Sequence, residues 1–166
     1  YTQGDVLSDV TGVISYNFQS YELLVTEAVT ITTDAGTPTR ETTMLFGTDF
    51  GFDFNQTVEL IRLVSNTGQN LRLNPITGGI AAIDMNLNPA TPMVGAAAYT
   101  NSFAGASTTE LFVIDHITKT LYLQNPPNNG TLVAKGMLGI DVSANNGFDI
   151  GSTSGKAWLV SSAAGS

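Results

Sequence analysis

Apolar and polar residues alternate along the first part of the chain. In residues 21–33, apolar side chains occupy positions two or four residues apart, namely Leu23, Val25, Val29 and Ile31. A two-residue period places such side chains on one face of an extended strand. The pattern predicts one strand over residues 21–33, preceded by another over residues 10–18. No stretch of ordinary helix length shows a 3.6-residue period, so we expect an all-β fold.

From residue 43 onward, short apolar runs are separated by Gly, Pro, Asn and Thr, the residues that tight turns favour. We expect strands at residues 44–47, 50–54, 59–65, 70–74, 79–84, 94–100, 110–115, 120–124, 131–136, 147–150 and 156–160.

A short motif marks a repeat in this strand-rich part. Gly51-Phe52-Asp53-Phe54 and Gly147-Phe148-Asp149-Ile150 are each followed by a turn and an apolar run. Counting strands from the motif gives one four-stranded unit over residues 51–84, a second over 94–136, and a third that opens at Gly147. A four-stranded antiparallel meander is the blade of a β-propeller, which typically has four to eight blades. We therefore expect propeller-blade-like meander repeats, arranged as an incomplete propeller or an open sandwich.

Turn-rich composition also suggests where the chain divides. Residues 34–43 have the composition of a linker, and residues 161–166 that of a flexible tail. We expect an N-terminal strand segment over residues 1–33 and a β-repeat domain over residues 44–160. The N-terminal segment is a candidate arm, or a strand donated to the sheet of a second copy.

Charge is sparse and negative. Only 12% of residues are charged, against about a quarter in an average protein, and the net charge is −8. This balance disfavours nucleic acid as a partner, because phosphate binding needs clustered Lys and Arg. The chain has no Cys, and no apolar run approaches the ~18 residues of a membrane span, so we expect no thiolate metal site and no membrane insertion.

Candidate catalytic chemistry is weak. His116 is the sole histidine and falls in an expected turn, so we interpret it as an exposed turn residue and not a general base. No nucleophile motif or phosphate-binding loop is present, so we expect neither enzymatic activity nor a cofactor. Asp53 and Asp149 are weak calcium candidates, with Asp49 and Asp141 nearby in sequence. The favoured alternative is that each carboxylate accepts turn amides and fixes the corner between its strand and the turn.

Other candidate sites concern packing and association. Arg62 and Arg72 lie in adjacent expected strands and are candidate cross-strand neighbours. They could form structural salt bridges or bind the acidic N-terminal segment of another copy, and the sequence leaves both open. Asn55 and Asn129 begin glycosylation sequons. We expect core packing for Phe50, Phe52, Phe54, Phe148 and Trp158. The candidate interface residues of the N-terminal segment are Tyr16, Phe18, Tyr21, Leu23, Val25, Val29 and Ile31.

Several of these segments resemble a known family. The segment that begins Gly51-Phe52-Asp53-Phe54 and ends Leu71-Arg72-Leu73-Asn74-Pro75, together with residues 95–101, 124–132 and 146–150, is similar to the bacterial family called domain of unknown function 4394. The resemblance covers residues 44–160 and implies a secreted or cell-surface β-repeat protein without assigned chemistry. Residues 1–33, through Gly4-Asp5-Val6-Leu7 and the strand that follows, resemble an OB-like module attached to secreted nucleases. That resemblance brings no nuclease residues onto this chain.

Two functions fit these observations. The first is an extracellular structural subunit that associates with copies of itself, by strand pairing or head-to-tail stacking, into a filament or surface layer. The alternative is an adhesin-type or carbohydrate-binding module of a larger surface protein, for which glycans are the partners.

Overall fold

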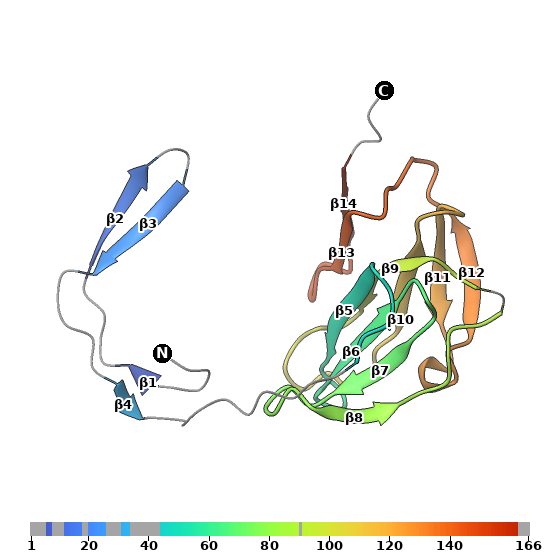
Figure 1. Cartoon of the computed structure of the whole chain (residues 1–166), viewed down its shortest axis with the longest axis horizontal. Helices are drawn as coiled ribbons and strands as arrows, with labels where there is room; N and C mark the ends of the chain where they lie inside the picture. Colours follow the sequence, from blue (N-terminus) through green and yellow to red (C-terminus); the bar gives the residue numbers. More distant parts are fainter. Residues whose placement is uncertain are drawn as a thin grey trace. The chain divides into compact units, whose positions relative to one another are not determined.

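The computed structural model describes residues 6–7, 12–17, 20–25, 31–33, 44–89 and 91–162. The chain forms two compact units, Tyr1–Arg40 and Glu41–Ser166, each with sheets of its own (Figure 1). Within the described ranges, the regular elements are β-strands apart from one short 3-10 turn, η1 (Pro127–Asn129). The all-β expectation is confirmed, and the sheets are antiparallel.

The first unit contains two strand pairs. Its strands are β1 (Val6–Leu7), β2 (Gly12–Asn17), β3 (Ser20–Val25) and β4 (Ile31–Thr33). β2 pairs with β3 and β1 pairs with β4. The single strand expected over residues 21–33 is therefore two strands with different partners. Alternation of apolar and polar residues shows on which face of a strand a side chain lies, but it does not show which strand is the neighbour. The pattern therefore could not reveal that the pairing partner changes between β3 and β4.

The second unit contains three sheets in chain order. The first sheet is β5 (Phe50–Asn55), β6 (Leu60–Ser65), β7 (Asn70–Leu73) and β8 (Ile80–Ile83). The second is β9 (Val94–Tyr99), β10 (Leu111–Asp115), β11 (Thr120–Gln124) and β12 (Leu132–Met137). The third pairs β13 (Asn146–Ile150) with β14 (Ala157–Ser161). Each copy of the Gly-Phe-Asp motif lies in the opening strand of its sheet, and the expected repeat is confirmed.

The expected strand at residues 44–47 is not formed. Its backbone is held by a side chain instead of a neighbouring strand: the Gln69 amide accepts from the Phe46 N–H at 2.9 Å and donates to the Met44 carbonyl at 3.0 Å. The apolar run that suggested a strand is an irregular segment bonded to the turn between β6 and β7.

The opening strands of the three sheets form the centre of the second unit. β9 contacts both β5 and β13, and all six of its residues are buried. A Cβ added to Gly51 would lie 2.6 Å from the carbonyl carbon of Ala96 and 2.7 Å from the Ala97 nitrogen. Glycine at this position therefore allows β5 and β9 to approach closely.

Apolar clusters join consecutive sheets face to face. One cluster combines Val64 of the first sheet with Val94 and Val113 of the second. Another combines Ala96 and Ile114 of the second sheet with Phe148 and Leu159 of the third. The sheets thus stack in chain order around β5, β9 and β13, as propeller blades do, and none closes into a barrel (Figure 1).

Strand alternation gives each sheet two faces. We call the face directed toward the following sheet the leading face, and the opposite face the trailing face. In the first sheet, the leading face carries Gly51, Asp53, Arg62, Val64, Asn70 and Arg72, and the trailing face carries Phe52, Ile61, Leu63, Leu71 and Ile83. In the third sheet, Phe148 and Leu159 lie on the trailing face, against the second sheet, and Asp149, Trp158 and Val160 lie on the leading face.

Candidate functional site

Asp53 links the first and second sheets through backbone amides. Its Oδ2 accepts a hydrogen bond from the Tyr99 N–H at 2.6 Å, and its Oδ1 accepts one from the Phe54 N–H at 2.7 Å. Burial raises the pKa of Asp53 despite these two hydrogen bonds, and the charge of Asp149 adds to the rise. The carboxylate of Asp53 thus accepts two backbone amides, but neither belongs to the expected turn, because Phe54 lies in β5 and Tyr99 in β9.

Arg62 is the centre of a buried polar cluster at the same junction. Only 2% of its side chain is exposed. Its Nη1 donates to Asn70 Oδ1 at 2.7 Å and to Asp84 Oδ2 at 2.6 Å. From the second sheet and its loops, Asn128 Oδ1 accepts from Nη2 at 2.8 Å and Tyr99 Oη from Nε at 3.3 Å. The guanidinium therefore ties the two sheets together, and little of it is left to offer to a second copy.

Arg72 lies directly opposite Arg62 across β6 and β7, as the strand spacing predicted. Two like charges can be neighbours here because Asp84 bridges them: Arg72 Nε and Nη2 donate to its two oxygens at 2.8 and 2.9 Å. Burial alone would raise the pKa of Asp84, but the hydrogen bonds from Arg72 and Arg62 outweigh it and lower the pKa. Of the two alternatives left open by the sequence, the structure contains the intramolecular salt bridges.

His116 lies in the expected turn but is buried, with 8% exposure, which corrects the expectation of an exposed residue. It is covered because the turn folds back on the segment before β9, where the His116 N–H donates to the Met93 carbonyl at 3.2 Å. The neighbouring Asp115 carboxylate accepts the backbone amides of Met93, Ile117 and Thr118, each at 2.9 Å. Asp115 is thus engaged with the backbone and does not orient the imidazole.

Asp49 and Asp141, which lie near the calcium candidates in sequence, each bond to a different set of side chains. Asp49 accepts from the side chains of Thr48 and Asn66, and Asp141 pairs with Lys119, which lowers the pKa of Asp141. Across residues 44–89 and 91–162, no three His, Cys, Asp or Glu side chains gather where they could hold a metal.

At the sequons, Asn55 Oδ1 accepts from both the N–H and the hydroxyl of Thr57, and Asn129 is exposed.

The aromatic side chains divide into two groups. Phe50, Phe54 and Phe148 are partly buried, whereas Phe52 is 59% exposed and Trp158 is 64% exposed. The expectation that all five pack in the core is therefore wrong for Phe52 and Trp158. These two lie on the outer faces at the two ends of the three-sheet stack of the second unit.

The trailing face of the first sheet is apolar and partly open. Ile83 is 76% exposed, and Met44 and Phe46 are exposed beside it. A groove of ≈ 550 Å³ lies here, bordered by Met44, Phe46, Leu71, Ile80 and Ile83. The leading face of the third sheet exposes Asp149, Trp158 and Val160. Inside the chain, the equivalent faces are buried at the two junctions, and we take these two end faces as the candidate functional site.

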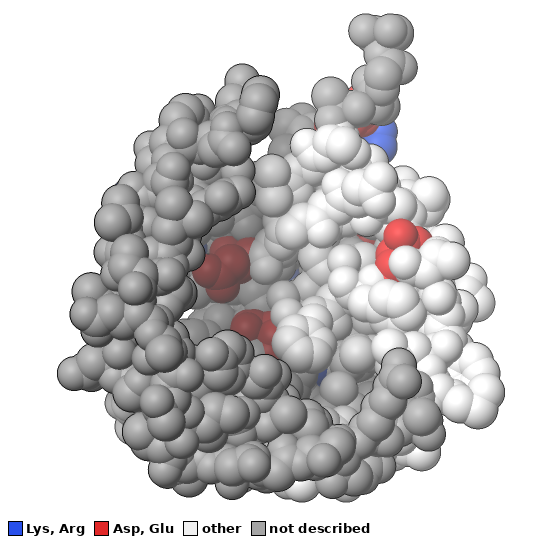
Figure 2. Space-filling model, turned by 60° about the vertical axis from the view of Figure 1, so that its left-hand side comes forward, with Lys and Arg blue, Asp and Glu red and all other residues white. Residues whose placement is uncertain are grey.

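Charged side chains are sparse on the face of the molecule that Figure 2 shows. On the face shown in Figure 2, uncharged residues make up most of the described surface and acidic side chains occur in isolated groups.

Among the N-terminal interface candidates, Tyr16 lies in β2; Tyr21, Leu23 and Val25 lie in β3; and Ile31 lies in β4. Phe18 and Val29 lie outside the described residues.

A comparison against protein families identifies the family of the chain. The family described as domain of unknown function (DUF4394) matches residues 16–166. The chain belongs to this family. Neither a search of curated proteins nor a search of solved structures found a match. The DUF4394 match begins before residue 44 and so takes in part of the N-terminal unit, further than the resemblance at residues 44–160 indicated. No helix in the described part of this DUF4394 chain is long and apolar enough to cross a membrane.

Most of the residues at the junction between the first and second sheets could not be identified from the sequence of this DUF4394 chain. Asp84, Tyr99 and Gln124 belong to different sheets or loops, and nothing in their spacing shows that they converge. One signal was available: Gly95 opens β9 at the position that Gly51 and Gly147 take in β5 and β13. An alignment of the three opening strands on this glycine would have marked β9 as the opening strand of the second sheet.

Proposed function

We propose that the chain is a structural subunit of an extracellular assembly in which copies associate head to tail. In this arrangement, the leading face of the third sheet in one copy packs on the trailing face of the first sheet in the next. The proposal rests on the exposure of apolar side chains on these two faces. Each face exposes large apolar side chains at an end of the stack, namely Phe52 and Ile83 on one and Trp158 and Val160 on the other, whereas apolar side chains at both internal junctions are packed in clusters.

The two end faces have complementary features. Trp158 projects from the third sheet with an exposed indole, and the groove beside Ile83 is lined mainly by apolar side chains. A tryptophan that fills an apolar pocket is a frequent energetic centre of protein interfaces. Asp149 occupies the motif position of Asp53, whose carboxylate accepts a backbone amide from the following sheet. We expect Asp149 to accept an amide from the neighbouring copy in the same way.

Strand pairing provides a second contact between copies. The third sheet has two strands among the described residues, whereas the first and second have four each. A strand edge with unpaired amides and carbonyls can pair with another chain. We propose that the β2–β3 hairpin of a second copy adds to the free edge of β14. Head-to-tail contacts of this heterologous kind propagate into a filament when they do not close into a ring.

An extracellular location is part of the proposal. It is supported by the low charge and the Thr- and Asn-rich composition of the chain, and by the two sequons with Asn55 and Asn129. We propose no catalytic role for the chain. Detection of the protein in the culture medium or surface fraction of its source cells would support this location, and confinement to the interior would contradict it.

Sedimentation velocity of the full chain across a concentration series tests the association. We expect the weight-average sedimentation coefficient to rise with concentration, and Trp158→Ser to suppress the rise. Ile117→Ser is the matched control, because Ile117 is 63% exposed but lies in the β10–β11 turn, away from both end faces. A wild-type chain that stays monomeric at all concentrations, or an equal effect of the two substitutions, would overturn the proposal.

Deletion of residues 1–33 separates the two contacts. We expect the shortened chain to keep a β-rich circular dichroism spectrum and to form smaller species than the full chain. Unchanged association after the deletion would refute the hairpin contact and leave the stacking contact in place.

A further inference from the structure

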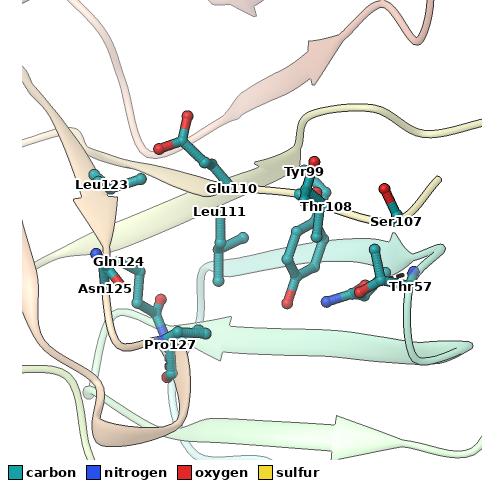
Figure 3. A pocket seen from close by; sticks show the side chains of 12 residues that line it. Thr57, Tyr99, Ser107, Thr108, Glu110, Leu111, Leu123, Gln124, Asn125 and Pro127 are labelled. Carbon is teal, nitrogen blue, oxygen red and sulfur yellow. Dashed lines mark hydrogen bonds between the residues drawn. The ribbon is translucent and has the colours of Figure 1, made fainter.

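A polar cavity lies beside the junction between the first and second sheets, away from the two end faces. Its volume is ≈ 390 Å³, within the ~300–1,000 Å³ usual for small-molecule sites. Its walls come from the ends of β5, β9 and β11 and from the loop that precedes β10. Figure 3 shows Tyr99 and Leu111 in the middle of this wall, between Thr57 on one side and Gln124 on the other.

Gln124 supplies the observation that points to a ligand. Its side chain is 1% exposed, and its Nε2 donates to the Pro127 carbonyl at 2.7 Å and to Asn70 Oδ1 at 3.3 Å. Because both partners are acceptors, these bonds fix which end of the amide carries the oxygen. The remaining atom, Oε1, is buried without a hydrogen-bond partner. A buried acceptor left unpaired is costly, so a donor from a bound molecule would be favoured there.

The wall opposite Gln124 is held in place before any ligand binds. Asp53 anchors the Tyr99 backbone, and Arg62 donates to the Tyr99 hydroxyl. The loop before β10 is closed by hydrogen bonds from Asn101 Nδ2 to the Thr108 carbonyl at 2.9 Å and from Thr109 Oγ1 to the Thr100 carbonyl. A preformed wall loses little conformational entropy on binding.

The chemistry of the lining indicates the class of ligand. Hydroxyl and amide side chains predominate, and Glu110 is the charged residue among those that border the cavity. A phosphate or carboxylate ligand would meet no cation here, and the net charge of −8 would repel it. Leu111, Leu123 and the Tyr99 ring add apolar surface. A ligand with many hydroxyl donors and an apolar ring face satisfies both kinds of surface.

We propose that this cavity binds a neutral hexose unit, with a sugar hydroxyl donating to Gln124 Oε1. Glu110 and Thr108 at the rim accept further hydroxyl hydrogen bonds. This inference does not rest on the assembly proposal, because Gln124 and the cavity lie apart from Trp158 and Ile83. The hexose could be free or the end of a polysaccharide, since both present the same ring.

Amide NMR of the full chain titrated with neutral methyl hexopyranosides tests the inference. We expect at least one sugar to shift the side-chain amide signals of Gln124 and the backbone signals of residues 107–111. The anionic analogue of that sugar, its hexuronate, should bind more weakly. A soluble polysaccharide that ends in the same sugar distinguishes the two sources: tighter binding than the methyl glycoside identifies the polysaccharide, and equal binding identifies the free unit.

Two variants keep the test independent of folding. Gln124→Met removes the unpaired acceptor and should abolish the shifts. Thr108→Val alters only the rim and should raise the Kd about two- to tenfold, as expected for one lost hydrogen bond. Thr118→Val, in the exposed β10–β11 turn, is the matched control and should leave the Kd unchanged. No shift with any sugar at tens of millimolar, shifts confined to other residues, or equal Kd values for the Thr108 and Thr118 variants would overturn the proposal.

Discussion

Asp84→Asn tests whether the buried ion cluster holds the first and second sheets together. The substitution keeps the shape of the side chain but removes the charge that compensates two arginines. Asp84 is 7% exposed and accepts three hydrogen bonds from Arg62 and Arg72, at 2.6, 2.8 and 2.9 Å. Removing one partner of a buried ion pair costs about 3–5 kcal/mol, because the remaining charge stays buried and uncompensated. This is a large fraction of the ~5–15 kcal/mol by which a domain is stable.

Urea unfolding followed by far-UV circular dichroism measures this loss. Asp141→Asn is the matched control, because it makes the same substitution in the exposed ion pair with Lys119. Exposed pairs contribute little, so the control should unfold close to the wild type. Similar midpoints for the two variants would refute the assignment of Asp84 as the buried counter-ion of Arg62 and Arg72.

The remaining predictions concern pH and the close approach of β5 to β9. The pKa of Asp84 is lowered on folding, so its contribution to stability is present above the unfolded value of about 4 and is lost as pH falls below it. The difference in unfolding free energy between the wild type and Asp84→Asn should therefore shrink on acidification, and a constant difference would contradict the ion pairing. The pKa of Asp53 is raised, so its effect has the opposite sign: stability is lost as pH rises from about 4 through the folded pKa, and Asp53→Asn should show a flatter pH dependence there. Gly51→Ala should cost about 1–3 kcal/mol or more, since the new Cβ would meet the backbone of β9 at 2.6 Å. Gly147→Ala, at the equivalent position, meets only the exposed Val160 side chain at 3.3 Å and should cost clearly less in the same urea assay.

The strands of the second unit could be predicted from the sequence because each depends on local information. Alternation, turn residues and the Gly-Phe-Asp motif together located β5 to β14 and the repeat. The junction could not be predicted, because Arg62, Asp84 and Asn128 converge only through the packing of separate sheets. Aromatic residues at motif positions were assigned to the core as a group. Their burial differs because Phe148 faces the second sheet, whereas Phe52 and Trp158 lie on the end faces.

Cross-linking between engineered cysteines tests the head-to-tail arrangement most directly, since the natural chain has no cysteine. Val160→Cys and Ile83→Cys place one thiol on each end face, at positions 72% and 76% exposed. The two variants, one of them isotopically labelled, are mixed at an associating concentration and treated with a short bis-maleimide. Mass spectrometry should then show links between residue 160 of one copy and residue 83 of another in excess over same-site links. Predominant 160–160 or 83–83 links, or no links where sedimentation shows association, would contradict head-to-tail assembly.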